Sequence, residues 1–259
     1  MLCRMGKQIL RKDKKDKHLT EPVAAFIIIA ALLLTMAVSM LGGWEAERAA
    51  RDAAQQAVQA GAQAGPFGGC RQLSDPLLVL VNSQTPLPEG WQVTPRMVDD
   101  ELVDIAMYED YAAMCKAAEK EDVWFWVASG YRSVEEQEEV LARAIEENRK
   151  AGMGEKEAEE DALRTIAQPG CSEHHTGLAI DLNEVSDAFE KTKAYAWLQE
   201  HSTDYGFIER YQEEKASITG IDKESWHYRY VGRKHAGEMK RLGLCLEEYV
   251  VYLQKQGVR

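Results

Sequence analysis

The chain has 259 residues, of which 45% are hydrophobic and 29% are charged, proportions that are ordinary for a globular protein. This length is sufficient for one sizeable domain with additional segments. The net charge of −12 argues against a protein that binds nucleic acid by neutralising phosphates, so we expect no nucleic-acid partner.

The charge is distributed unevenly along the chain. Residues 1–21 contain seven Lys or Arg and three acidic residues, a net charge of +4, which leaves −16 for the remainder. Residues 23–41 then carry no charged side chain, and a helix of that length spans about 28 Å, close to the ~30 Å hydrocarbon core of a bilayer. Because basic residues stay on the cytoplasmic side, we predict a cytoplasmic tail at 1–21 and a single-pass transmembrane anchor at 22–43. The remainder would then lie outside the cytoplasm.

A cleavable signal peptide is the alternative, since Ala37, Val38 and Ser39 offer small residues suited to cleavage. The apolar run is longer than a usual signal core, however, and we favour an uncleaved anchor. Residues 45–64 are rich in Ala, Gln and charged residues, which predicts a helical stalk within a linker at 44–73. The folded domain is predicted to occupy residues 74–259.

Short apolar and β-branched runs alternate irregularly with helical patterns in the predicted domain. The strands we expect lie at 77–81, 123–128, 178–182 and 226–231. The helices we expect lie at 99–119, 134–149, 155–167 and 191–201. The absence of a regular β-α-β alternation favours the α+β class.

Five cysteines are present, and Cys3 is expected in the cytoplasmic tail. The other four lie in the exported part, where disulfides persist, and the sequence does not choose among their three possible pairings: Cys70, Cys115, Cys171 and Cys245. A disulfide at Cys171 would stiffen the loop that carries His174, and a free thiol there is an equal alternative.

Candidate metal ligands come from the six histidines. His174 and Asp181 flank Gly177, so a turn at the glycine followed by a strand would bring both side chains to one point. An Asp in an apolar strand needs compensation for its charge, which a cation supplies, and zinc accepts both nitrogen and oxygen ligands. The neighbouring His175 is expected to point away, into a second layer or to the surface.

A third ligand is offered by His227, which lies among aromatic residues near the C-terminal end of the domain. Three protein ligands would leave a fourth position open, as in catalytic zinc sites. Glu224 precedes His227 by three residues and could act as the general base on a water molecule. His201 and His235 are expected at the surface.

Three motifs occur in the order of a known family. Residues 172–181 match S-x-H-x-x-G-x-A-x-D, residues 224–227 match E-x-W-H, and residues 129–137 match S-G-Y-R-S-x-x-x-Q. Over residues 77–237 the chain resembles the VanY-type D-alanyl-D-alanine carboxypeptidases, a zinc peptidase family of the LAS type. That family also includes L,D-carboxypeptidases and, more distantly, VanX-type dipeptidases.

The resemblance implies a small antiparallel sheet flanked by helices, of the Hedgehog/D-Ala-D-Ala peptidase type. It also implies zinc as the cofactor, held by His174, Asp181 and His227. Further roles follow from the matched positions: Glu224 as general base, Arg132 as the group that stabilises the oxyanion, and Gln137, Ser172, Tyr131 and Trp226 as substrate-binding residues.

The resemblance predicts a zinc-dependent D,D-carboxypeptidase that removes the terminal D-Ala from stem peptides of the cell wall. One alternative is an L,D-carboxypeptidase that acts on tetrapeptide stems. The two activities differ in a contact worth only ~1–3 kcal/mol, so the sequence does not separate them. A second alternative is a non-catalytic wall-binding protein with the same fold. It is disfavoured because no ligand or base is missing.

Overall fold

The computed structural model describes residues 43–56, 58–59 and 72–258. The chain divides into two compact units, residues 1–50 and residues 51–259. Residues 43–56 are helical, while the predicted span at 23–41 lies outside the described residues. None of the helices described is long and apolar enough to cross a bilayer. The tail, anchor and stalk therefore stay predictions.

Four antiparallel strands form the central sheet of the second unit, in the order β3-β4-β6-β5. They are β3 (Val127–Ser129), β4 (Ala179–Leu182), β5 (Phe207–Tyr211) and β6 (Glu224–Tyr230). The strands predicted at 178–182 and 226–231 are confirmed as β4 and β6. The strand predicted at 123–128 begins later, at Val127, and β5 was not foreseen.

The two faces of this sheet have different roles. Ile180, Leu182, Tyr228 and Tyr230 belong to the main hydrophobic core cluster, together with buried residues of two helices, α2 (Ile105–Glu119) and α5 (Lys193–His201). Because side chains alternate along a strand, the residues between them face the opposite side. That side carries the polar residues of the site, among them Asp181, His227 and Arg229.

The helix predicted at 99–119 is only partly correct. Residues 95–104 form a hairpin of β1 (Pro95–Val98) and β2 (Glu101–Asp104), and α2 begins at Ile105. Asp99 and Asp100 make the turn with φ of 49° and 70°, a left-handed conformation that Asp tolerates better than most residues. Asp104 then caps the helix, accepting a 2.8 Å hydrogen bond from the amide of Ala106.

The strand predicted at 77–81 is wrong, although the segment is buried. Residues Pro76–Leu78 form a 3-10 helix, η2, and the rest pairs with no strand among the described residues. Side chains provide hydrogen bonds that a sheet would otherwise give: Gln72 bonds both the amide and the carbonyl of Leu80. Arg229 donates to the carbonyls of Leu77 and Val79. Apolar composition alone predicted burial here but not pairing.

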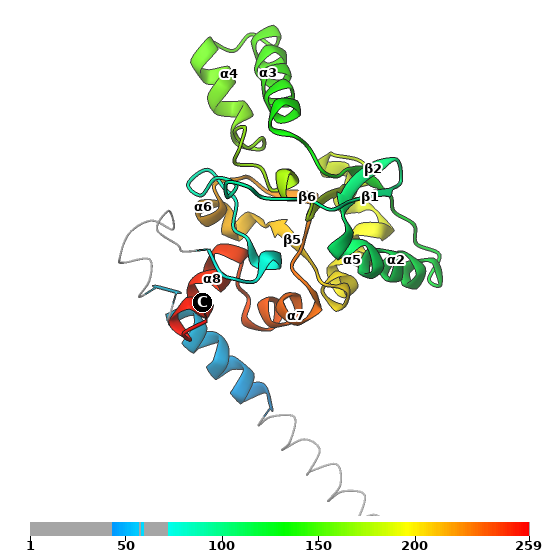
Figure 1. The fold of residues 1–259 in the computed structure, drawn as a ribbon, viewed down its shortest axis with the longest axis vertical. Helices are drawn as coiled ribbons and strands as arrows, with labels where there is room; N and C mark the ends of the chain where they lie inside the picture. Colours follow the sequence, from blue (N-terminus) through cyan, green and yellow to red (C-terminus); the bar gives the residue numbers. More distant parts are fainter. Residues whose placement is uncertain (1–42, 57, 60–71, 259) are drawn as a thin grey trace, which may run out of the picture. The chain divides into compact units, whose positions relative to one another are not determined.

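The remaining helices surround the sheet and extend from it. Figure 1 shows α3 (Val134–Lys150) and α4 (Glu155–Ala162) side by side as a hairpin. The helix predicted at 134–149 is confirmed, and the helix predicted at 155–167 is confirmed in its first part, since α4 ends at Ala162. Helix α5 confirms the prediction at 191–201. The other helices are η3 (Glu173–Thr176), η4 (Asp187–Lys191), η5 (Ser202–Tyr205), η6 (Glu213–Lys215), α6 (Ala216–Thr219), α7 (Arg233–Leu242) and α8 (Leu246–Lys255). The predicted α+β class, with small antiparallel sheets flanked by helices, is confirmed.

Candidate active site

The register of the sheet brings the predicted metal ligands together. Asp181 on β4 lies directly opposite His227 on β6. His174 lies in η3, and Gly177, with φ of 72°, makes the turn that leads from η3 into β4. One ligand atom from each of the three side chains falls within 4.8 Å of the other two. All three residues are buried. The predicted convergence across Gly177 is therefore present.

The distances among these side chains are close to those between ligands of a tetrahedral zinc ion. Ligands about 2.0–2.2 Å from zinc lie about 3.3–3.6 Å apart in a tetrahedron. The Nε2 atom of His174 is 3.4 Å from Oδ2 of Asp181. The Nδ1 atom of His227 is 3.1 Å from Oδ1 of the same aspartate. That Oδ1 atom is buried and accepts no hydrogen bond from any described residue. A buried carboxylate oxygen that accepts no hydrogen bond suits a cation.

The proton of His174 is fixed on the ring nitrogen that faces away from the ligand cluster. Its Nδ1 atom lies 2.7 Å from the carbonyl oxygen of Gly130. Because a carbonyl only accepts, Nδ1 carries the hydrogen and Nε2 keeps a lone pair for the metal. Gly130 is required here, since a Cβ atom would lie 2.2 Å from the carbonyl oxygen of Leu102.

Glu224, at the start of β6, lies beside the ligand cluster. Its Oε2 atom is 3.6 Å from Nδ1 of His227, and the side chain is buried. Burial raises the pKa of Glu224 to about 8, with a further increase from Asp181 that is opposed by His227 and Arg132. A carboxylate with a raised pKa next to a metal position can accept a proton and release it again, which is the requirement for a general base.

Arg132 is held by two side chains of its own motif. Its guanidinium donates to Oγ of Ser129 at 2.7 Å and to Oε1 of Gln137 at 2.8 Å. Gln137 is buried, and its Nε2 atom donates to the carbonyl of Ala167 at 2.7 Å. The predicted role of Gln137 in binding substrate stays a prediction. In the structure its amide group bonds Arg132.

His175 is buried rather than exposed, so of its two predicted locations the second layer is correct. Its Nδ1 atom lies 2.7 Å from the carbonyl of Arg132, and its Nε2 atom accepts from the amide of Gly170 at 3.1 Å. Burial lowers the pKa of His175. Together with the bond from the amide of Arg132 to the carbonyl of His174, these contacts join the arginine motif to the ligand loop.

The other predicted substrate-binding residues surround the same centre. Ser172 is buried and caps η3, its hydroxyl accepting from the amide of His174 at 3.3 Å. Tyr131 and Trp226 are half-buried, and Trp226 packs against the hydrophobic core. Their roles toward a substrate stay predictions.

Comparison with known proteins agrees with this geometry. A family model described as VanY, D-alanyl-D-alanine carboxypeptidase, matches residues 100–233. The chain belongs to the VanY family. A D-alanyl-D-alanine carboxypeptidase of Enterococcus faecalis is 40% identical over 176 residues. These residues make up 67% of this chain and 65% of that relative, just under two thirds of its length.

Two solved structures are similar to this VanY-family protein. A vancomycin-resistance D,D-pentapeptidase VanY from a VanB-type resistance cassette, in complex with Zn(II), is 39% identical with a TM-score of 0.63. The match covers 68% of this chain and 99% of that one. VanYB in complex with D-alanine-D-alanine is 40% identical with a TM-score of 0.62, covering 67% of this chain and 96% of that one.

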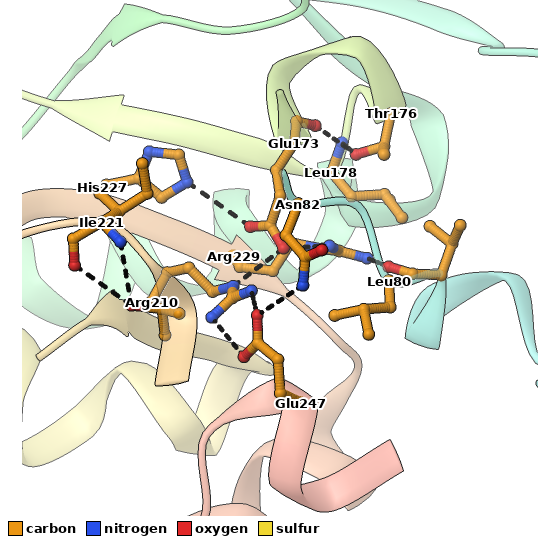
Figure 2. Close-up of polar contacts among 12 residues, drawn as sticks. Leu80, Asn82, Glu173, Thr176, Leu178, Arg210, Ile221, His227, Arg229 and Glu247 are labelled. Atoms are coloured by element: carbon orange, nitrogen blue, oxygen red, sulfur yellow. Dashed lines mark hydrogen bonds and ion pairs between the residues drawn. The ribbon is translucent and has the colours of Figure 1, made fainter. Parts of the chain in front are cut away.

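Four charged residues of this VanY-family protein were not predicted from the sequence, and Figure 2 shows them on one side of His227: Glu173, Arg210, Arg229 and Glu247. Glu173 and the guanidinium groups of Arg210 and Arg229 are fully buried and form ion pairs of 2.9 and 2.8 Å. Glu247 from α8 binds Arg210 on its other side. The one available signal was the alternation in β6, which places the charged Arg229 on the same face as His227.

A cavity of about 180 Å³ opens beside the site. Its lining includes Cys171, which precedes Ser172, and Tyr211, whose ring packs 4.8 Å from that of His227. No charged side chain is among the lining residues described. Cys115, Cys171 and Cys245 are free thiols in the described part of the chain, and Cys70 lies outside it. Of the two alternatives for Cys171, the structure has the free thiol.

Proposed function

We propose that this protein is a zinc-dependent D,D-carboxypeptidase that removes the terminal D-Ala from peptidoglycan stem peptides. The observation that carries the proposal is the convergence of two imidazoles and one carboxylate, with a buried glutamate and an arginine beside them. The complex of VanYB with D-alanine-D-alanine supports this class of substrate. A wall-binding protein without activity would not need both the base and the arginine at the ligand cluster.

His174, Asp181 and His227 would hold the zinc ion. When bound, zinc lowers the pKa of water towards ~7 and polarises a carbonyl group. Glu224 accepts the proton of the attacking water and delivers it to the departing amine of D-Ala. Arg132 stabilises the negative charge that develops on the carbonyl oxygen, because its guanidinium stays charged and is held in place by Ser129 and Gln137.

The uncharged cavity next to Tyr211 offers space for the part of the stem peptide that precedes the scissile bond. The residue directly before the scissile bond is a D-amino acid when a D,D bond is cut and an L-amino acid when an L,D bond is cut, so the two activities place different residues here. Specificity for a D,D bond over an L,D bond would therefore depend on the lining of this cavity. Rates on matched pentapeptide and tetrapeptide substrates measure it directly.

The proposal is tested with Glu224→Gln in the full chain purified in detergent. We expect the variant to keep one equivalent of zinc, since its three ligands are unchanged, and to lose D-Ala release from a D-Ala-D-Ala pentapeptide by at least about 10²-fold. Removing zinc from the parent with a chelator should abolish release, and added zinc should restore it. Release at the parent rate by the variant contradicts the mechanism.

We also propose that residues 22–43 anchor the enzyme in the cell membrane, with the catalytic domain outside the cytoplasm. The uncharged run at 23–41 and the basic residues before it support this topology. Protease digestion of intact spheroplasts tests it. The domain should be degraded without lysis, whereas protection of the domain until lysis contradicts the orientation.

A further inference from the structure

Glu173 lies directly behind the metal ligand His227. Its Oε2 atom faces Nε2 of His227 at 3.6 Å, on the side of the ring opposite Nδ1 (Figure 2). Nδ1 faces the ligand cluster, 3.1 Å from Asp181 and 3.6 Å from Glu224. The ring of His227 therefore joins two carboxylate environments, one on the metal side and one behind it.

Among the described residues, the two facing atoms have no alternative partner. Oε2 of Glu173 and Nε2 of His227 are both buried, and neither forms a hydrogen bond of 3.5 Å or less with any residue that the structure describes. One is an acceptor and the other carries a hydrogen in one tautomer of imidazole. A movement of a few tenths of an ångström would bring them into hydrogen-bond contact.

The carboxylate of Glu173 is fixed in place by two arginines. Its Oε1 atom accepts from Nε of Arg210 at 2.9 Å and from Nη1 of Arg229 at 2.8 Å. Arg210 is held in turn by Glu247 at 3.0 and 2.6 Å. Arg229 is held by the carbonyls of Leu77 and Val79 at 3.1 and 2.9 Å. Two positive charges on Oε1 keep the group ionised, so Oε2 can only accept.

We propose that Glu173 is a positioning residue for the zinc site: it holds the proton of His227 on Nε2 and leaves the lone pair of Nδ1 for the metal. This inference rests on the zinc site of the proposed function and adds a residue to it. A carboxylate behind a ligand histidine fixes the ring and raises its basicity, and its loss typically costs ~10–100-fold in metal affinity.

Substitution by glutamine makes a sharp test, because an amide has one acceptor and one donor end. The two guanidinium groups require the amide oxygen on their side, since an NH2 group there would face other donors. The NH2 group of Glu173→Gln then points at Nε2 of His227 and makes that nitrogen an acceptor. The proton moves to Nδ1, where zinc needs a lone pair.

The matched control is Glu248→Gln. Glu248 is also buried and also forms an ion pair, at 2.7 Å with Lys215, and it caps α8 through the amide of Cys245. It makes no contact with His227 among the interactions described. The control therefore loses an ion pair and some stability without changing the environment of the zinc ligand.

The experiment measures zinc dissociation constants of the purified full-length proteins in detergent at pH 7.5, by competition with a chromophoric chelator. We expect Glu173→Gln to bind zinc about 10–100-fold more weakly than the parent and Glu248→Gln to stay within about threefold. Equal weakening in both variants, or affinity within threefold of the parent for Glu173→Gln, overturns the proposal. Failure of the parent itself to bind zinc would instead contradict the proposed function.

A second measurement avoids the case in which Glu173→Gln does not fold. Nitrogen-15 NMR of the zinc-bound parent, labelled at histidine, reports which ring nitrogen carries hydrogen. We expect His227 to show a hydrogen on Nε2 that exchanges slowly, with zinc bound at Nδ1. A zinc-bound Nε2 atom in His227 overturns the proposal without any substitution.

Discussion

The rings of His174 and His227 meet edge to face, with centroids 5.0 Å apart and planes at 85°. Asp181 lies next to both, 3.4 Å from Nε2 of His174 and 3.1 Å from Nδ1 of His227. In this arrangement a carboxylate surrounded by two imidazoles needs a positive charge nearby. Burial alone would lower the pKa of His227, but Asp181 and Glu173 raise it to about 9. Without zinc, a proton on His227 supplies that charge.

Zinc binding should therefore release a proton and depend on pH. A histidine binds zinc as a neutral imidazole, yet below about pH 9 the metal-free protein holds His227 protonated. We expect zinc affinity to rise about tenfold per pH unit between pH 6 and 8. Calorimetry in two buffers with different ionisation enthalpies counts the proton. An affinity that does not change with pH across this range contradicts the protonation of His227 in the metal-free protein.

Gln137 should act on catalysis through Arg132. The change Gln137→Leu removes the 2.8 Å bond to the guanidinium and leaves its volume nearly filled. A misplacement of a catalytic group by ~1 Å costs about 10²-fold, so we expect kcat/KM to fall by that order at unchanged zinc content. Gln199→Leu, which removes a bond to Glu209, is the matched control and should keep the parent rate. Loss of zinc from Gln137→Leu would point to a different role.

The lack of a side chain at position 130 should be essential. In Gly130→Ala the new Cβ atom would lie 2.2 Å from the backbone oxygen of Leu102, so the segment has to shift. This shift moves the carbonyl that holds His174. We expect destabilisation of about 1–3 kcal/mol in urea unfolding, together with weaker zinc binding. For Gly237→Ala in α7, where no described atom lies within 4 Å of the new Cβ, we expect equal or higher stability.

The buried ion pairs of Glu173 with Arg210 and Arg229 should stabilise the fold most at neutral pH. Burial raises the pKa of Glu173, but Arg210 and Arg229 outweigh it and hold that pKa well below its ordinary value. A carboxylate with a lowered folded-state pKa stabilises the fold above its unfolded pKa of ~4.3 and loses this effect as pH falls. Breaking such a buried pair costs about 3–5 kcal/mol. The difference in the free energy of unfolding between the metal-free parent and Glu173→Gln should therefore be largest at pH 7 and should decrease below about pH 4. A difference that increases as the pH falls contradicts the lowered pKa of Glu173.

Local signals account for the parts of the structure that the sequence predicted. Ser133 and Glu136 cap α3 reciprocally. The segment of sequence from His174 to Asp181 contains one turn followed by one strand. Such features depend on residues close in the chain. The buried cluster of Glu173 depends on Arg210 and Glu247, which only the folded topology brings near, and each of these charges resembles a surface residue in the sequence. The segment at 77–81 was predicted incorrectly for the same reason, because the side chains that bond its backbone come from Gln72 and Arg229.

Glu247 belongs to α8, the last helix of the chain, and it is joined through Arg210 and Glu173 to His227. Asn82, close to the start of the folded domain, also binds Glu247 at 3.1 Å. A polypeptide that is still being synthesised lacks this helix and leaves Arg210 without one of its two carboxylates. The surroundings of His227 therefore reach their final form only after α8 has packed onto the domain.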